Sequence, residues 1–177
     1  MTNTIDAEQT TGMTDTGLLI LRIAVGATML QAGLIKAFDF GTAVGFMESS
    51  GWRLPGFAAF MVTAAETLGG IGLLLGVLTP LAACAVIGAM VDAWAVNVSA
   101  DAFWSQPFNV PFLAAFGAAT LLFTGAGALS IDHRAFGRSR VSARAAVGLV
   151  ALGVIAAVVT WIALSGTNPI HLTKPMV

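Results

Sequence analysis

The sequence predicts an all-α membrane protein, namely a four-helix transmembrane bundle followed by a fifth C-terminal transmembrane helix. Of the 177 residues, 57% are hydrophobic and only 10% are charged, whereas a soluble domain carries roughly 25% charged residues. The apolar residues form long continuous runs without strand-like alternation. A backbone in lipid must satisfy its own hydrogen bonds, and continuous runs favour helices over a barrel.

Five apolar runs set the predicted order of segments along the chain. The length of each run is close to the ~20 residues that a helix needs to cross a bilayer. Residues 1–16 are polar, threonine-rich and acidic, without the basic start of a signal peptide, so we expect a disordered N-terminal tail. The expected spans of the bundle, within residues 17–133, are 17–35, 56–78, 81–99 and 110–129; a basic loop at 134–144, the fifth helix at 145–164 and a C-terminal tail at 165–177 follow.

The connections between these runs are short. The segments 38–55 and 100–109 contain several aromatic residues, which suit the headgroup zone of a membrane. Thr79 and Pro80 mark a tight turn, so the second and third spans are expected to lie side by side.

Orientation follows from the loop at 134–144, which holds the arginines 134, 138, 140 and 144. Cytoplasmic loops carry an excess of Lys and Arg. The sequence therefore predicts a cytoplasmic N-terminus and a C-terminus on the outer side.

Several function classes lack support in the sequence. The formal net charge of −1 gives no argument for nucleic acid binding, and no nucleotide-binding glycine motif is present. The single cysteine, Cys84, has no disulfide partner and no neighbouring ligands, so no metal site is expected. No CxxC, haem-ligand or flavin pattern occurs, so we expect no intrinsic cofactor.

Three charged residues interrupt the apolar runs: Arg22, Glu66 and Asp92. Ionisable groups inside a membrane are costly and are therefore candidates for function. At ~1.5 Å per residue, Glu66 and Asp92 both lie roughly 17–18 Å from the inner edge on neighbouring helices. We expect them in one intramembrane polar pocket, on faces shielded from lipid. For the two acids, the alternative is that they only fix the packing of the helices. For Arg22, the alternative is that its side chain reaches back to the headgroups.

Three motifs resemble those of the DoxX family of small bacterial membrane proteins. The first contains Arg22, Gly33 and Lys36; the second contains Glu66, Gly69, Gly70, Gly76 and Thr79; the third is the run from Gly125 to Asp132. The resemblance extends over roughly residues 17–133. It implies a four-helix core with both ends cytoplasmic, in a multi-pass protein of the bacterial cell membrane.

The resemblance also implies an association with membrane oxidoreductases, including quinone-linked and redox-defence systems. It carries Arg22, Lys36 and Glu66 over as candidate pocket residues, whereas Asp92 rests on the depth argument alone. For Lys36, at the outer boundary, a simple headgroup anchor is the alternative.

Three functions remain open at this point. The first is a subunit of a quinone-linked oxidoreductase assembly, with a bound quinone in the pocket and other membrane subunits as partners. The second is a non-catalytic accessory subunit of a respiratory or other large complex, and the third is a small proton- or solute-conducting bundle. Catalysis by this chain alone is disfavoured, because it has no redox centre of its own.

Overall fold

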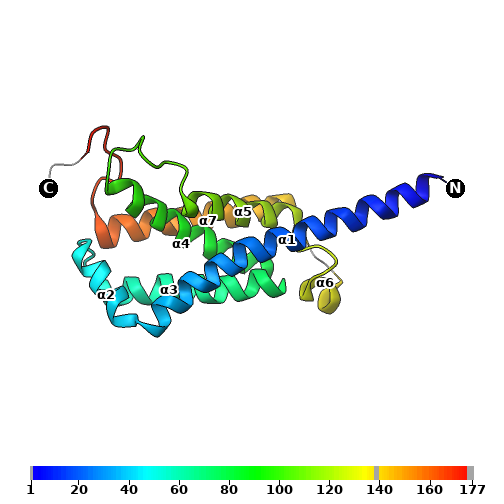
Figure 1. Cartoon of the computed structure of the whole chain (residues 1–177), viewed down its shortest axis with the longest axis horizontal. Coiled ribbons are helices and arrows are strands. Elements are labelled where there is room, and N and C mark those ends of the chain that lie inside the picture. The colour runs from blue at the N-terminus through cyan, green and yellow to red at the C-terminus, as the bar shows by residue number, and fades with distance from the viewer. Residues whose placement is uncertain (1, 138–139, 175–177) are drawn as a thin grey trace.

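The structure, a computed structural model, describes residues 2–137 and 140–174, and this part of the chain contains helices and no strands. Figure 1 shows an elongated bundle in which the main helices run along the long axis. The helices are α1 (Thr2–Phe38), α2 (Phe40–Ser49), α3 (Pro55–Leu75), α4 (Thr79–Ser99), α5 (Val110–Thr124), α6 (Ile131–Phe136) and α7 (Ala143–Thr160), and α7 continues into a π-helical turn, η1 (Trp161–Ser165).

The predicted membrane fold is confirmed. Four helical segments in the described part are long and apolar enough to cross a bilayer: Thr11–Phe38, Pro55–Leu75, Thr79–Ser99 and Ala143–Ser165. The fifth apolar helix, α5, is shorter, with 15 residues. At ~1.5 Å per residue it is about 22 Å long, less than the ~30 Å of a hydrocarbon core.

The helices form two layers that meet at α3 and α4 (Figure 1). One layer contains α1 and α3, with α2 across one end; the other contains α4, α5 and α7. We call the two ends of the bundle the α2 end and the α6 end. The termini lie toward opposite ends of the long axis, as expected for an odd number of helices running along it.

Glycines allow α1 and α3 to approach each other closely. A Cβ atom on Gly70 would lie 2.5 Å from the backbone nitrogen of Leu30, and one on Gly33 would collide with the backbone of Thr67. Membrane helices lack a hydrophobic force that drives them together, so close backbone contact supplies much of their attraction. Gly33 of the first motif and Gly70 of the second therefore have a packing role.

The turn between α3 and α4 occupies residues 76–78, just before the predicted Thr79-Pro80 position. Gly76 ends α3 in the left-handed conformation, with φ of 62°, as glycine does readily at helix C-termini. Thr79 and Pro80 already belong to the first turn of α4, where proline is favoured because it lacks an N–H that would need a partner. The expected pairing of these two helices is confirmed.

The fourth apolar run ends earlier than predicted. Instead of continuing to Leu129, α5 stops at Thr124, because Gly125 and Gly127 adopt φ values of 84° and 78°. The chain then turns back in a compact loop and forms the short helix α6. This loop delivers backbone carbonyl oxygens to the α6 end of the bundle.

The N-terminal segment also differs from the prediction. Residues 1–16 are expected to be disordered, but α1 is continuous from Thr2, and its first turns project beyond the bundle (Figure 1). Extending an existing helix needs no new nucleus, and the segment contains no proline to stop it. Asp15 also ties the helix down, since its carboxylate accepts the N–H of Ala128 at 2.8 Å. Arg138 of the predicted basic loop lies outside the described residues.

Glycine 70 provides a test of the α1–α3 contact. We expect Gly70→Ala to lower the free energy of unfolding by about 1–3 kcal/mol, because the added methyl group forces the helices apart. Gly148→Ala is the matched control, since no heavy atom lies within 4 Å of a Cβ at that position on α7. Thermal unfolding in detergent measures both; equal melting temperatures for the two variants would contradict the packing account.

Candidate functional site

Small residues on α4 and α7 leave space between the two layers of the bundle. Ala85, Gly88 and Ala89 on α4 face Gly153 and Ala156 on α7. The two helices nevertheless touch, because a Cβ on Gly153 would lie 2.9 Å from the carbonyl oxygen of Cys84. The small-residue face of α4 thus lines a cavity and also contacts α7.

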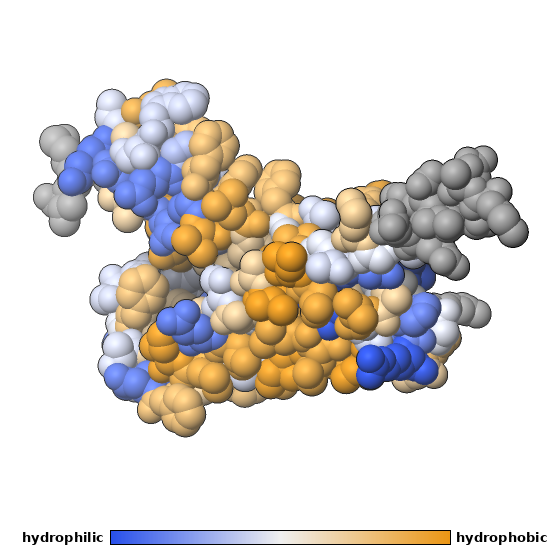
Figure 2. Space-filling model, turned by 45° about the vertical axis from the view of Figure 1, so that its right-hand side comes forward, coloured by the Kyte–Doolittle hydropathy of each residue, from blue (hydrophilic) through white to orange (hydrophobic). Residues whose placement is uncertain are grey.

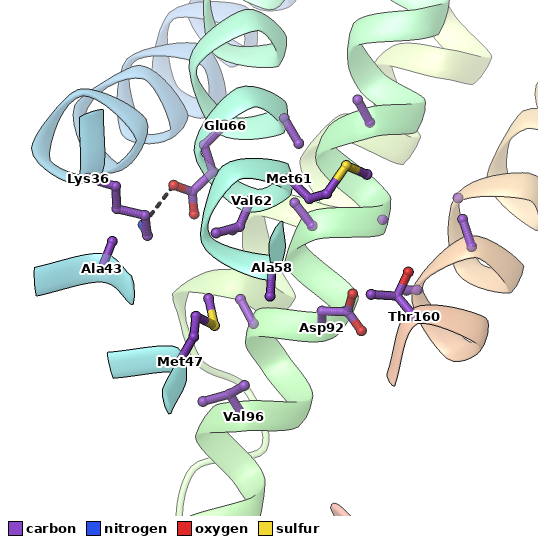
Figure 3. Close-up of a pocket in the computed structure, with 18 of the residues that line it drawn as sticks. Lys36, Ala43, Met47, Ala58, Met61, Val62, Glu66, Asp92, Val96 and Thr160 are labelled. Atoms are coloured by element: carbon purple, nitrogen blue, oxygen red, sulfur yellow. Dashed lines mark hydrogen bonds and ion pairs between the residues drawn. The ribbon is translucent and has the colours of Figure 1, made fainter. Parts of the chain in front are cut away.

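The cavity has a volume of about 750 Å³ and lies between α3 and α7, with α4 as its floor (Figure 3). Ligand sites in proteins span roughly 300–1,000 Å³. Most of the lining is aliphatic or aromatic. The polar lining side chains are Lys36, Asp39, Thr42, Glu66, Cys84, Asp92, Asn97 and Thr160.

Aromatic residues close the cavity at the α2 end. Trp52 lines it and packs edge-to-face on Trp161 of η1, with ring centroids 5.7 Å apart. The backbone N–H of Arg53 donates to the carbonyl oxygen of Leu164 at 2.8 Å. These contacts join the α2–α3 connection to the end of α7, so the end wall is built from parts far apart in the sequence.

Lys36 and Glu66 form an ion pair on one side of the cavity (Figure 3). The Lys36 ammonium group donates to Glu66 Oε2 at 2.7 Å and to the carbonyl oxygen of Ala32 at 3.3 Å. Glu66 is only 3% exposed, whereas the Lys36 side chain is 29% exposed. The pair joins the last turn of α1 to the middle of α3 and compensates a carboxylate that would otherwise be costly at this depth.

Asp92 lies on another part of the lining. It is half-buried, and its carboxyl group points toward Thr160 of α7 and away from the ion pair (Figure 3). Within the described residues, Asp92 has no hydrogen bond or ion pair. Glu66 and Asp92 therefore share one cavity, but the partner of Glu66 is Lys36 rather than the second acid.

Arg22, the remaining predicted pocket residue, does not line this cavity. It is 1% exposed and lies at the α6 end, where its guanidinium group donates to four backbone carbonyl oxygens. The acceptors are Leu73 and Leu74 in the last turn of α3, and Ala126 and Leu129 in the loop before α6, at 2.7–3.1 Å. The last carbonyl groups of a helix lack the regular i+4 donor, and here only that of Leu73 also accepts a cap N–H, from Gly76 at 3.2 Å. Arg22 therefore caps α3 and holds the loop.

Asp132 completes the cluster at the α6 end. Its carboxylate accepts the backbone N–H groups of Leu78 at 2.8 Å and Thr79 at 2.9 Å, which are free at the start of α4. The backbone N–H of Asp132 donates in turn to the carbonyl oxygen of Gly76. The Arg22 and Asp132 motif positions thus fix the turns at this end, which is a structural role that the sequence did not reveal.

The contribution of α7 to the cavity was also missed. The sequence treats the fifth helix as an addition to the bundle, whereas the structure makes it one wall. Gly153, Ala156 and Ala157 follow one another at helical spacing, and such a small-residue stripe signals close approach of another helix. Within the described residues, no three metal-ligating side chains come together.

A scan against protein-family models matches the model described as DoxX to residues 17–100. These residues form a DoxX domain. The match covers a little under half of the chain and includes α1 to α4, hence Arg22, Lys36, Glu66 and Asp92. Neither the search of curated proteins nor the search of solved structures gave a match.

The DoxX domain supplies the ion pair and the floor of the cavity, while α7 lies beyond residue 100 and adds the facing wall. The run from Gly125 to Asp132, which contributed to the resemblance, also lies outside the matched range. The cavity is therefore lined partly by the residues that the DoxX model matches and is completed by α7, which lies outside the match.

Arg22 provides the test of the α6 end. Arg22→Met removes the guanidinium donor from four buried or half-buried carbonyl oxygens, so we expect the free energy of unfolding to fall by about 3 kcal/mol or more. Arg144→Met, at an exposed position in the first turn of α7, is the control. Thermal unfolding of both variants in one detergent is the measurement, and an unchanged melting temperature for Arg22→Met would refute the capping role.

The ion pair is tested by a double-mutant comparison. Lys36→Met leaves the buried Glu66 carboxylate uncompensated, and we expect a loss of about 3 kcal/mol. Adding Glu66→Gln removes that charge, so the double variant should unfold at a higher temperature than Lys36→Met alone. Lys174→Met, on the exposed C-terminal tail, controls for the loss of one positive charge. A double variant less stable than either single variant would count against the pairing.

Proposed function

We propose that this protein is a DoxX-type subunit of a quinone-linked or redox-defence oxidoreductase system and that its cavity binds the headgroup of a membrane quinone. The observation that supports this most is the combination of a largely apolar cavity with the Lys36–Glu66 pair and Asp92 on its walls. Sites for small organic ligands have this composition, with few polar groups that fix orientation.

The position of the cavity favours a ligand that is dissolved in the bilayer. Figure 2 shows a broad apolar surface over the helices, with hydrophilic residues mainly toward the ends of the bundle. Ala85 of α4 and Leu152 and Ala156 of α7 line the cavity and are exposed at the same time. The cavity therefore opens sideways between α3 and α7, where an isoprenoid chain can remain in contact with lipid.

The chemistry of the lining suits a quinone ring. Lys36 uses its ammonium group for Glu66 and Ala32, and an ammonium group has three N–H donors. The third donor is available to a ligand oxygen, and the small residues on the floor leave room for a flat ring. The chain would bind and orient the quinone, while a partner subunit supplies the electrons, because the chain shows no redox motif of its own.

The orientation in the membrane belongs to the same proposal. With the basic segment around α6 in the cytoplasm of a bacterial cell, the N-terminus is cytoplasmic and the C-terminus lies outside. The Arg22 cluster then lies at the cytoplasmic end, and the Trp52–Trp161 wall lies at the outer end.

Filling the cavity tests the proposal directly. Purification in mild detergent, followed by organic extraction and chromatography, measures the quinone that accompanies the protein. We expect near-stoichiometric quinone with the unaltered chain and at least a tenfold loss with Ala85→Phe, because the ring occupies the floor of the cavity; tenfold corresponds to about 1.4 kcal/mol.

Ala151→Phe is the matched control, since Ala151 is exposed on α7 but does not line the cavity. Equal quinone in both variants would contradict the proposal. A stable large complex without any quinone would instead support an accessory subunit, and proton conduction by the lone protein in liposomes would support a conducting bundle.

A further inference from the structure

The cavity follows α4 as a long groove. Lining residues recur along this helix at helical spacing from Leu81 to Asn97, a length of about 24 Å at ~1.5 Å per residue. The helix starts at the α6 end, where Asp132 accepts the N–H of Thr79, and it runs toward the α2 end. Leu81 and Asn97 therefore lie near opposite ends of the groove.

The half of the groove toward the α2 end, which we call the polar half, contains Asp92 and Asn97 of α4. Lys36 in the last turn of α1 and Thr160 in the last turn of α7 also line it. A polar headgroup finds hydrogen-bond partners here in either protonation state of Asp92, because a neutral carboxyl group can donate and a carboxylate accepts.

The half toward the α6 end, which we call the apolar half, has a different lining. Its residues on α4 include Leu81, Cys84 and Ala85, and those on α7 include Leu149 and Leu152. The Cys84 thiol already donates to the carbonyl oxygen of Leu149 at 3.3 Å. A polar group of a ligand would find no free partner among these side chains, so this half suits hydrocarbon.

Both halves belong to a single cavity of about 750 Å³ (Figure 3). Asp92 and Leu81 are separated along α4 by roughly 16–17 Å at ~1.5 Å per residue. A ring that binds near Asp92 leaves most of this length to another group. An alkyl or isoprenoid chain attached to the ring matches the space in its polarity and in its elongated form.

The openings of the cavity favour the same direction for the chain. The Trp52–Trp161 contact closes the α2 end. Leu81, Ala85 and Leu152 line the apolar half and are exposed, so this half is open to lipid along its side. A chain that starts at a ring in the polar half can therefore lie in the apolar half and remain in contact with the bilayer.

We infer that the apolar half holds the chain of the same ligand, so that the quinone lies along α4 with its ring toward the α2 end and its chain toward the α6 end. The inference rests on the proposed function and adds the direction in which the ligand lies. The ring is then nearer to a redox partner docked at the α2 end than to one docked at the α6 end.

The test uses two photoreactive benzoquinones with the full chain in lipid nanodiscs. One carries an azide on the ring, and the other carries a trifluoromethyl diazirine at the end of a decyl chain. Cyanogen bromide cleaves after Met90 and trypsin cleaves after Arg134, so the two halves of the α4 wall separate into residues 62–90 and 91–134. Mass spectrometry then assigns the labelled residues within each fragment.

We expect the ring azide to label residues 91–134 around Asp92 and the chain end to label residues 81–88, and excess unlabelled decylbenzoquinone should remove both labels. Ala85→Phe should lower the chain-end label on residues 62–90 at least about tenfold, which corresponds to about 1.4 kcal/mol, because its ring fills the apolar half. Ala151→Phe, at an exposed position of α7 outside the lining, is the matched control and should leave the label unchanged.

Two results would overturn the inference. Chain-end label on residues 91–134 together with ring label on residues 81–88 would give the ligand the opposite direction. Chain-end label that unlabelled quinone does not displace would mean that lipid chains fill the apolar half. In both cases, displaceable ring label in the cavity leaves the proposed function standing. If neither probe gives displaceable label on a folded protein, the proposed function fails together with the inference.

Discussion

The requirement that polar groups in a membrane find partners inside the protein governs this structure. At the α6 end, Arg22 meets it inside the protein, because its buried guanidinium group donates to four carbonyl oxygens. In the cavity, Lys36 and Glu66 meet it by pairing with each other. Asp92 does not meet it within the described residues, and this difference separates a structural polar group from one available to a ligand.

The same requirement explains where the backbone departs from regular helix. The loop between α5 and α6 lies at the α6 end of the bundle, and its carbonyl oxygens need donors that lipid cannot supply. Arg22 provides them from α1, and Asp132 accepts the N–H groups that the start of α4 leaves free. The α6 end of the bundle is fixed in this way, while the Trp52–Trp161 contact and the Arg53–Leu164 hydrogen bond join the helices at the α2 end.

Much of the fold could be predicted from the sequence, because lipid imposes helix formation on any long apolar run. The ends of the helices were harder to predict. Run length alone could not show that Gly125 stops α5, because glycine is common inside membrane helices. Whether a glycine ends a helix depends on tertiary contacts, here the hydrogen bond from Arg22 to the carbonyl oxygen of Ala126 in the following loop. Likewise, the polar composition of residues 1–16 suggested disorder, whereas α1 extends through them from the membrane span.

The candidate site was predicted in part. Depth arguments placed Glu66 and Asp92 on neighbouring helices, and both line the same cavity. However, the depth of a residue along its helix does not tell in which direction around the helix its side chain points. Depth therefore could not show that Lys36 pairs with Glu66 or that Arg22 lies in a separate cluster. The wall formed by α7 depends on a contact between segments about 65 residues apart, such as Cys84 with Leu149, which local patterns do not encode.

Photocrosslinking with an azido-substituted quinone in native membranes tests the central claim most directly. If the unsatisfied polar groups mark a ligand site, the label should appear on peptides from α3, α4 and α7, around Asp92, and excess unlabelled quinone should remove it. Label confined to the outer faces of the bundle, or label that unlabelled quinone does not displace, would show that this cavity does not hold the ligand.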